Sequence, residues 1–242
     1  MNGLFMSLKE NVLFVLEFLG CVVAVFLIAY LIEKYLHRKN NDTERILSTR
    51  KVAMIGMFSA ISAILMILEI PVFFAPGFYK FDLSELPALI GAFAFGPVAG
   101  VMIEFVKIII KLLFKGTSTA FVGELANFIV GCSLLLPASV IYLFRKNKKT
   151  AIAACIVGTL CMTVVGTLFN AVYLLPKFAQ MFGMPMEAII EMGTAINPHI
   201  TSVTTLVMMA VAPLNILKGG AVSLITILIY KKLSGILKGG AH

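Results

Sequence analysis

The chain has 242 residues, of which 60% are hydrophobic and only 13% are charged, and its formal net charge is +8. Soluble domains are closer to half apolar and a quarter charged, so this composition excludes an ordinary soluble domain and indicates an integral membrane protein. The positive charge does not indicate nucleic acid as a partner, because the basic residues lie beside apolar segments, where they act as topology signals. The lipid bilayer is the first expected partner.

Several classes of active site are not supported. The four cysteines and three histidines are scattered, without CxxC pairs or ligand spacing, so no metal site is expected. The sequence contains neither GxxxxGK[ST] nor GxGxxG, so we expect no nucleotide hydrolysis by this chain. No Ser/His/Asp or Cys/His arrangement stands out, and we predict no catalytic residues and no cofactor.

The apolar segments predict an all-α membrane fold. A helix needs about 20 apolar residues to cross the bilayer. We predict helices at residues 11–33, 52–71, 85–96, 97–114, 120–143, 151–175 and 200–230. The third is short, and Gly96-Pro97 predicts a turn before the fourth. The first is interpreted as a retained helix, because its apolar core is longer than the roughly 7–15 residues of a signal peptide.

The basic residues predict the orientation. Thirteen of the twenty lysines and arginines fall in three clusters, at residues 34–51, 145–149 and 231–238. If seven helices alternate, all three clusters lie on one side of the membrane. The positive-inside rule then places them and the C-terminus in the cytoplasm and the N-terminus outside the cell membrane.

Charged residues interrupt the fourth predicted helix. Glu104, Lys107 and Lys111 are spaced i, i+3 and i+7 and share a helix face. A charge at bilayer depth costs about 2.5–3.5 kcal/mol or more, so such residues usually face a bundle interior. We favour an ion pair between Glu104 and Lys107. A proton relay remains the alternative.

Polar residues near the outer ends of several helices predict a ligand site. The loop from Pro71 to Ser84 is rich in aromatic residues, and three later helices carry amide and ammonium groups at i, i+3 spacing. Such groups suit a flat, uncharged heteroaromatic ligand with polar edges, although they could instead bond between helices. The candidate ligand residues are Phe81, Asp82, Glu124, Asn127, Asn170, Tyr173, Asn215 and Lys218.

A stripe of small residues lies on the second predicted helix. Ala53, Gly56, Ala60 and Ala63 form small-xxx-small patterns that allow another helix to approach closely. The stripe either packs inside the bundle or docks a partner subunit. The second interpretation matters because the chain carries no energy source of its own.

Five blocks, in this order, carry a family resemblance: Asp82-Leu-Ser-Glu-Leu-Pro-Ala-Leu-Ile-Gly, Phe95-Gly-Pro-Val-Ala-Gly, Gly116-Thr-Ser-Thr-Ala, Gly123-Glu-Leu-Ala-Asn-Phe and Pro213-Leu-Asn-Ile-Leu-Lys. Residues 50–232 resemble the substrate-binding (S) components of energy-coupling factor (ECF) vitamin transporters, in particular the riboflavin branch. The resemblance implies six helices around a vitamin pocket that opens outward and is capped by the loop at residues 72–84.

The resemblance also implies roles for individual residues. Asn215 and Lys218 would bond the polar edge of the isoalloxazine ring, with Asn170 and Asn127 nearer the ribityl chain. Gly56 and Ala60 would dock on a transmembrane coupling subunit that two ATPase subunits drive. Riboflavin is then the transported ligand, and acceptance of FMN is left open.

The predicted organisation is an extra N-terminal transmembrane helix with a basic linker (1–45) followed by the six-helix domain (46–242). Three alternatives stay open. The chain could serve another vitamin, or it could be a solitary proton-coupled carrier that needs Glu104 and Lys107. It could also be a membrane enzyme or scaffold without a transported ligand.

Overall fold

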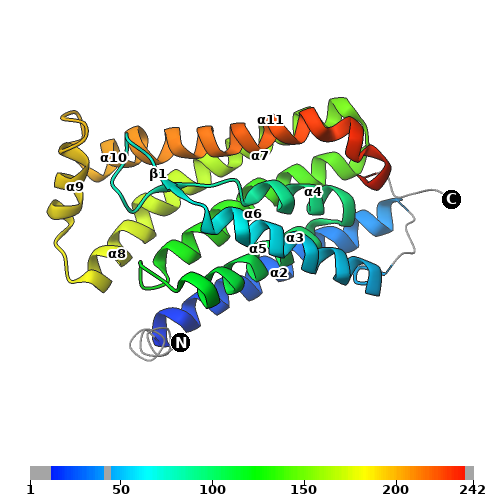
Figure 1. Cartoon of the computed structure of the whole chain (residues 1–242), viewed down its shortest axis with the longest axis horizontal. Coiled ribbons are helices and arrows are strands. Elements are labelled where there is room, and N and C mark those ends of the chain that lie inside the picture. Colours follow the sequence, from blue (N-terminus) through cyan, green and yellow to red (C-terminus); the bar gives the residue numbers. More distant parts are fainter. Residues whose placement is uncertain (1–11, 41–44, 238–242) are drawn as a thin grey trace.

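The computed structural model describes residues 12–40 and 45–237, which form a helical bundle (Figure 1). The long helices are α2 (Val12–Asn40), α3 (Thr49–Ile67), α5 (Pro97–Lys115), α6 (Val122–Phe144), α7 (Lys148–Phe169) and α11 (Ala212–Leu237), with a short apolar helix α4 (Glu85–Phe95). By length and composition, five helical segments of the described chain can cross a membrane. Each of the seven predicted segments therefore contains a helix, and the predicted turn at Gly96 separates α4 from α5. Helix α3 ends at Ile67, so the predicted end at residue 71 was too late, because Ile70 and Pro71 form a strand.

The core lies where α4, α6, α7 and α11 meet. Helix α6 packs along α7, α7 packs along α11, and α3 packs against α5. Phe93 of α4 stacks on Tyr142 of α6 with ring centroids 4.4 Å apart. Apolar residues such as Leu134 and Met162 are fully buried around this pair. Apolar packing thus holds these four helices together.

Helix α2 is the predicted extra helix, and it packs against α5 and α6 through Phe14, Phe18 and Val22. It continues to Asn40, beyond the predicted end at residue 33. Glu33 is buried, and its Oε2 accepts a hydrogen bond from the backbone N–H of Val98, 2.9 Å away. Residues 1–11 and 41–44, which belong to the predicted N-terminal region, lie outside the described residues.

The sixth helix was predicted to end at residue 175, before Pro176, and this prediction was wrong. A π-helical turn, η1 (Asn170–Leu174), follows α7 and leads directly into α8 (Leu175–Phe182). Pro176 directly follows this wider turn, and the chain continues as a helix although proline donates no N–H to it. The predicted outer loop 176–199 is accordingly largely helical, with α9 (Met186–Thr194) completing it.

The end of the bundle that carries α8 and α9 is crossed by a small hairpin. Strands β1 (Ile70–Pro71) and β2 (Lys80–Phe81) pair antiparallel. Between them, Ala75 and its aromatic neighbours pack against α8, α9 and the segment α10 (Val203–Leu206) and η2 (Val207–Val211). In Figure 1 this connection runs from α3 across to α10. It therefore bridges the two sides of the bundle at the end that carries α8 and α9.

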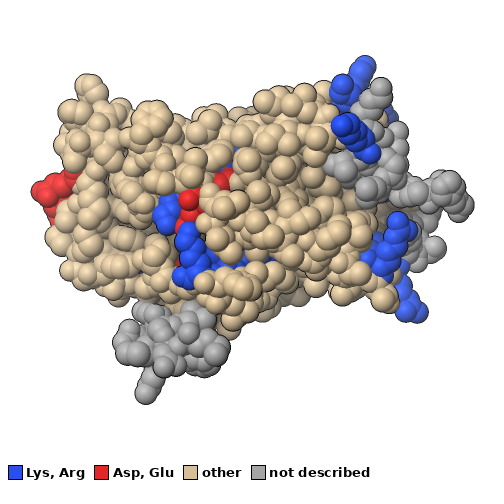
Figure 2. All heavy atoms as spheres, viewed as in Figure 1, with Lys and Arg blue, Asp and Glu red and all other residues tan. Residues whose placement is uncertain are grey.

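Basic side chains gather at the opposite end. The last turn of α2 carries His37, Arg38 and Lys39, and α7 begins with Lys148 and Lys149. Figure 2 shows the basic atoms at this end and acidic atoms at the α9 end. Residues 238–242, with the end of the third basic cluster, lie outside the described residues.

Candidate ligand-binding site

A cavity of about 370 Å³ lies beneath the hairpin, at the end of the bundle that carries α8 and α9. This volume falls within the usual range for small-molecule sites, about 300–1,000 Å³. Its lining comes from the 77–82 segment, the 118–130 region, both π-helical turns and the first half of α11. Six of the eight candidate ligand residues line it: Asp82, Glu124, Asn127, Asn170, Asn215 and Lys218.

One wall of the cavity is aromatic. Phe78 of the hairpin loop stacks on Phe178 of α8 with ring centroids 4.9 Å apart and an interplanar angle of 30°. The Tyr79 hydroxyl donates a hydrogen bond to Asn170 Oδ1 at 2.9 Å, and Asn170 Nδ2 donates to the Gly166 carbonyl at 2.8 Å. Asn170 is the first residue of the π-helical turn η1, and such turns are frequent at functional sites. Flat ligand surfaces would find apolar ring faces here.

The floor of the cavity holds the ammonium group of Lys218. Its Nζ lies 3.0 Å from Asp82 Oδ2, 2.9 Å from Glu85 Oε1 and 3.4 Å from Asn127 Oδ1. Asp82 is fixed in turn, because its Oδ1 accepts a 2.8 Å hydrogen bond from the Ser84 N–H. Two carboxylates thus hold Lys218, and its longest polar contact is with the side-chain amide of Asn127.

A second buried lysine lies behind this floor. Lys107 Nζ lies 2.7 Å from Glu104 Oε2 and 3.2 Å from Glu85 Oε1, and it donates to Ser84 Oγ at 2.8 Å. The predicted ion pair between Glu104 and Lys107 is confirmed. Lys111, predicted on the same row, pairs instead with Glu124 at 2.5 Å. Glu85 connects the two lysines, and sequence reasoning missed it.

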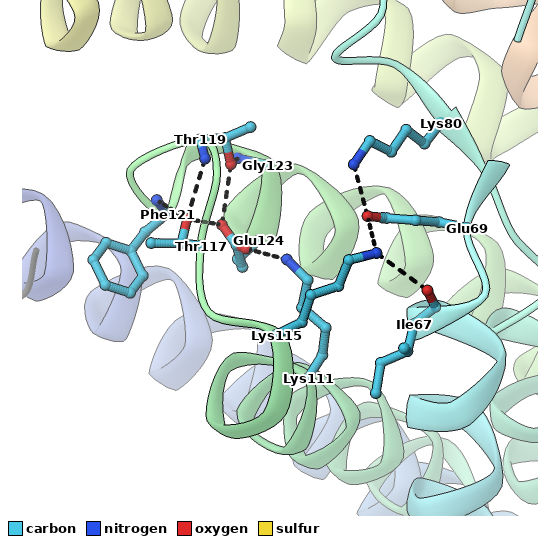
Figure 3. Close-up of polar contacts among 10 residues, drawn as sticks. All are labelled: Ile67, Glu69, Lys80, Lys111, Lys115, Thr117, Thr119, Phe121, Gly123 and Glu124. Carbon is cyan, nitrogen blue, oxygen red and sulfur yellow. Dashed lines mark hydrogen bonds and ion pairs between the residues drawn. The ribbon is translucent and has the colours of Figure 1, made fainter. Parts of the chain in front are cut away.

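The side of the cavity mouth is organised by Glu124 (Figure 3). Its Oε2 accepts hydrogen bonds from Thr117 Oγ1 at 3.0 Å and Thr119 Oγ1 at 3.2 Å, while Lys111 binds Oε1. Thr117 Oγ1 also accepts from the Phe121 N–H, 3.0 Å away. These bonds hold a loop in which Ala120 and Phe121 have φ of 48° and 69°. These bonds therefore stabilise the conformation of this loop beside the cavity.

A surface ion cluster ties the hairpin to α5. Glu69 Oε1 lies 2.7 Å from Lys80 Nζ and 2.8 Å from Lys115 Nζ, and Lys115 also donates to the Ile67 carbonyl at 3.1 Å (Figure 3). Burial alone would raise the pKa of Glu69, but the hydrogen bonds from Lys115 and Lys80 outweigh it and lower this pKa. Figure 2 shows charged atoms of both signs at the centre of this face. These ion pairs join the hairpin to α5 beside the cavity, and we call Glu69, Lys80 and Lys115 the clamp.

Asn215 is the cavity residue with an unused polar group. It is 6% exposed, and its Nδ2 has no hydrogen-bond partner among the described residues. Gly166 of α7 lies directly against this amide, so that a side chain at position 166 would collide with it. Buried polar groups are normally paired, so this amide is a strong candidate for a ligand contact.

The structure places the two other candidate ligand residues outside the cavity lining. Phe81 lies on β2, half-buried. The Tyr173 hydroxyl donates to Glu17 Oε2 of α2 at 2.7 Å, on the side of the helix away from the cavity. Sequence reasoning also missed Phe78, Tyr79 and Phe178 as individual lining residues, although the aromatic content of the 71–84 loop did point to its first two.

The small residues of α3 lie on two faces. Ala53, Gly56 and Ala60 are exposed, and a side chain built at Gly56 would meet no atom within 4 Å. Ala63 is 1% exposed and packs inward. Val52, Met57 and Ile64 extend the exposed face with apolar side chains. The described part of the chain leaves this face uncovered.

Comparison with known proteins gives concordant matches. Residues 50–230 match the family model for the ECF transporter substrate-specific component. The riboflavin transporter RibU of Staphylococcus aureus (strain TCH60) is 32% identical over 189 residues, which cover 78% of this chain and 93% of that protein. The riboflavin transporter FmnP of Bacillus subtilis (strain 168) is 28% identical over 188 residues, 77% of this chain and 93% of that protein.

A solved structure also matches. It is described as the structure and mechanism of the S component of a bacterial ECF transporter, and it superposes with a TM-score of 0.59 at 34% identity. The match covers 78% of this chain and 98% of that one.

Proposed function

Since this chain belongs to the family of ECF transporter substrate-specific components, we propose that it binds riboflavin from outside the cell and mediates its uptake. The chain is a multi-pass membrane protein and a transporter component, not an enzyme. The observation that carries the proposed ligand is a single cavity that combines an aromatic wall with the convergent amides and ammonium of Asn170, Asn215 and Lys218.

The chemistry of the cavity supports a neutral, flat, polar-edged ligand. Phe78 and Phe178 offer ring faces, and Asn215 offers an unpaired amide beside the Lys218 ammonium. On this proposal Asn215 and Lys218 bond the carbonyl edge of the isoalloxazine. Asn170, Asn127 and Glu124 lie toward the ribityl hydroxyls, while Phe81 and Tyr173 support neighbouring segments without touching the ligand.

The test is the absorbance spectrum of the detergent-purified protein between about 350 and 500 nm, followed by titration with riboflavin while its fluorescence is recorded. We expect a co-eluting flavin or saturable quenching near one ligand per chain. Losing one hydrogen bond to a charged group, about 1.5–3 kcal/mol, weakens binding roughly ten- to a hundredfold, so Lys218→Met should do so. Asn215→Ala leaves a buried ligand acceptor unpaired, which costs about 1–3 kcal/mol and should weaken binding by a similar factor. A colourless protein that fails to quench riboflavin would refute the ligand and direct the search to other vitamins.

Uptake on this proposal also needs a transmembrane coupling subunit and two ATPase subunits. The exposed face of α3 with Ala53, Gly56 and Ala60 is the proposed docking surface, because small residues let a partner helix approach its backbone. Gly56→Leu should preserve riboflavin binding and abolish ATP-driven uptake in vesicles. Gly20→Leu is the matched control, since Gly20 of α2 is also exposed with no atom within 4 Å of an added side chain. Equal uptake by both variants would exclude this surface.

The proposed topology follows the charges. The basic end of the bundle faces the cytoplasm of the cell, and the hairpin and cavity face outward. Residues 46–242 form the substrate-binding domain on this proposal, and residues 1–45 add one crossing before it. Cysteine labelling of a Glu187→Cys variant in intact cells tests this orientation, because Glu187 is exposed in the first turn of α9.

A further inference from the structure

Lys218 reaches the cavity from α11 with all three of its donors occupied. An ammonium group has three N–H donors, and here they face Asp82, Glu85 and Asn127. The two carboxylate contacts are near 3 Å, whereas the contact with Asn127 is 3.4 Å. The longest contact is therefore the one with the neutral amide of Asn127, which lines the cavity, and it is the contact that a ligand acceptor would replace. The two carboxylates decide where that third donor points.

Glu85 differs from Asp82 because it does not line the cavity. It is 1% exposed, in the first turn of α4, and its Oε1 contacts both Lys218 at 2.9 Å and Lys107 at 3.2 Å. A side chain that does not reach the ligand can affect binding only through the groups it holds.

Lys107 of α5 fixes the position of Glu85. Lys107 is fully buried, donates to Ser84 Oγ and Glu85 Oε1, and forms an ion pair with Glu104 Oε2 at 2.7 Å. Ser84 and Glu85 belong to the same short segment as Asp82, whose Oδ1 accepts from the Ser84 N–H. Both carboxylates that hold Lys218 thus come from one turn that Lys107 anchors to α5. Lys218, on α11, is aligned by that turn.

We propose that Glu85 is a positioning residue of the ligand site, which aims the third donor of Lys218 into the cavity by bridging it to Lys107. This inference rests on the proposed function, since riboflavin affinity is its readout. Without the Glu85 carboxylate, Lys218 keeps one carboxylate partner and its ammonium can rotate toward Asp82, so the donor on the cavity side is no longer directed.

The test is a double-mutant cycle between Glu85→Gln and Lys218→Met, measured as the riboflavin dissociation constant of the full-length protein in detergent. We expect Glu85→Gln alone to raise this constant about tenfold or more. In the Lys218→Met background it should add less than about twofold, because a positioning residue has no effect once the positioned group is gone. Equal effects in both backgrounds would overturn the proposal.

Two further variants separate positioning from folding. Glu104→Gln is the matched control, since Glu104 also contacts Lys107 but is not in contact with Lys218; its affinity should stay within about twofold of the unmodified protein. An equal loss there would assign the effect to general disruption of the buried ions. Glu85→Asp keeps the charge and withdraws the carboxylate by about 1.5 Å. It should fold and bind more weakly, with a loss that disappears in Lys218→Met.

The outcomes distinguish this inference from the proposed function. If the unmodified protein bound no riboflavin, the proposed ligand would be wrong and this inference would fall with it. If the unmodified protein bound riboflavin and Glu85→Asp or a folded Glu85→Gln bound it equally well, only the positioning role would be wrong.

Discussion

Glu33 anchors the additional helix α2 to the start of α5. Helix α5 begins after Gly96, which has no side chain to cap it, and Pro97 has no N–H to donate. The next free N–H, that of Val98, is capped across the bundle by Glu33 at 2.9 Å. Gly96 allows this approach, since a Cβ there would lie 2.6 Å from the Glu33 carboxyl carbon, and its φ of 107° favours glycine.

The Glu33→Ala variant removes this acceptor and leaves the Val98 N–H unpaired in a buried site. A buried hydrogen bond to a charged group contributes about 1.5–3 kcal/mol, and a negative charge at a helix N-terminus adds about 0.3–1 kcal/mol. We expect a loss near 2–4 kcal/mol. For a chain of this size, 1 kcal/mol corresponds to about 2–4 °C. The thermal unfolding midpoint should therefore fall by about 4–16 °C.

The assay is thermal unfolding of the purified protein in detergent, followed by thiol-reactive dye fluorescence at the buried cysteines Cys132 and Cys155. The matched control is Glu17→Ala on the same helix. Glu17 pairs with Tyr173 and Lys177 near the surface, where such a pair contributes about 0–1 kcal/mol. If the two variants lowered the midpoint equally, or if Glu33→Ala had no effect, the capping role of Glu33 would be refuted.

Three further expectations concern the cavity. Gly166→Ala should weaken riboflavin binding about tenfold or more by displacing the Asn215 amide, whereas Gly220→Ala, with open space around it, should bind normally; equal affinities would contradict the role of Asn215. Glu124→Gln should weaken binding about tenfold, because glutamine keeps only one acceptor oxygen for Lys111, Thr117 and Thr119 and the 116–121 loop is held less firmly; stopped-flow fluorescence would locate the loss mainly in slower association. Glu69→Gln should speed riboflavin release about two- to fivefold at pH 7 by weakening the clamp. The pKa of Glu69 is lowered in the folded protein. The clamp is therefore fully effective above the unfolded pKa of about 4.3 and is lost as the pH falls through the folded pKa. Riboflavin release from the unmodified protein should approach that of the variant only in acid.

The helices were predictable because membrane crossing imposes length and hydropathy on the sequence itself. The pair of Glu104 and Lys107 was predictable for a similar reason, since i, i+3 neighbours on one helix meet wherever that helix packs. Contacts between helices were not predictable in this way. The pairs Lys111 with Glu124 and Lys218 with Glu85 depend on how helices are rotated against each other, which no local spacing encodes.

The error at Pro176 has a related cause. Proline is a helix breaker in an isolated α-helical pattern, and the sequence alone gives no sign of the π-helical turn that precedes it. The same turn places Asn170 at the cavity while Tyr173, three residues later, points to α2. The spacing that grouped these two residues as ligand contacts assumed a regular α-helix throughout.

The ion pairs around the cavity also explain why amides are suited to discriminate between ligands. Five carboxylates and five lysines are paired between the mouth and the floor: Glu69, Asp82, Glu85, Glu104 and Glu124 with Lys80, Lys107, Lys111, Lys115 and Lys218. The set as a whole is balanced, so a charged ligand core would meet groups that already have partners. A neutral ligand instead gains most at Asn215, where the amide is unpaired, and at the longest contact of Lys218. Exchanging the Lys218 contact with Asn127 for a ligand carbonyl keeps every charge paired, which is the condition for burying these groups without a large desolvation cost.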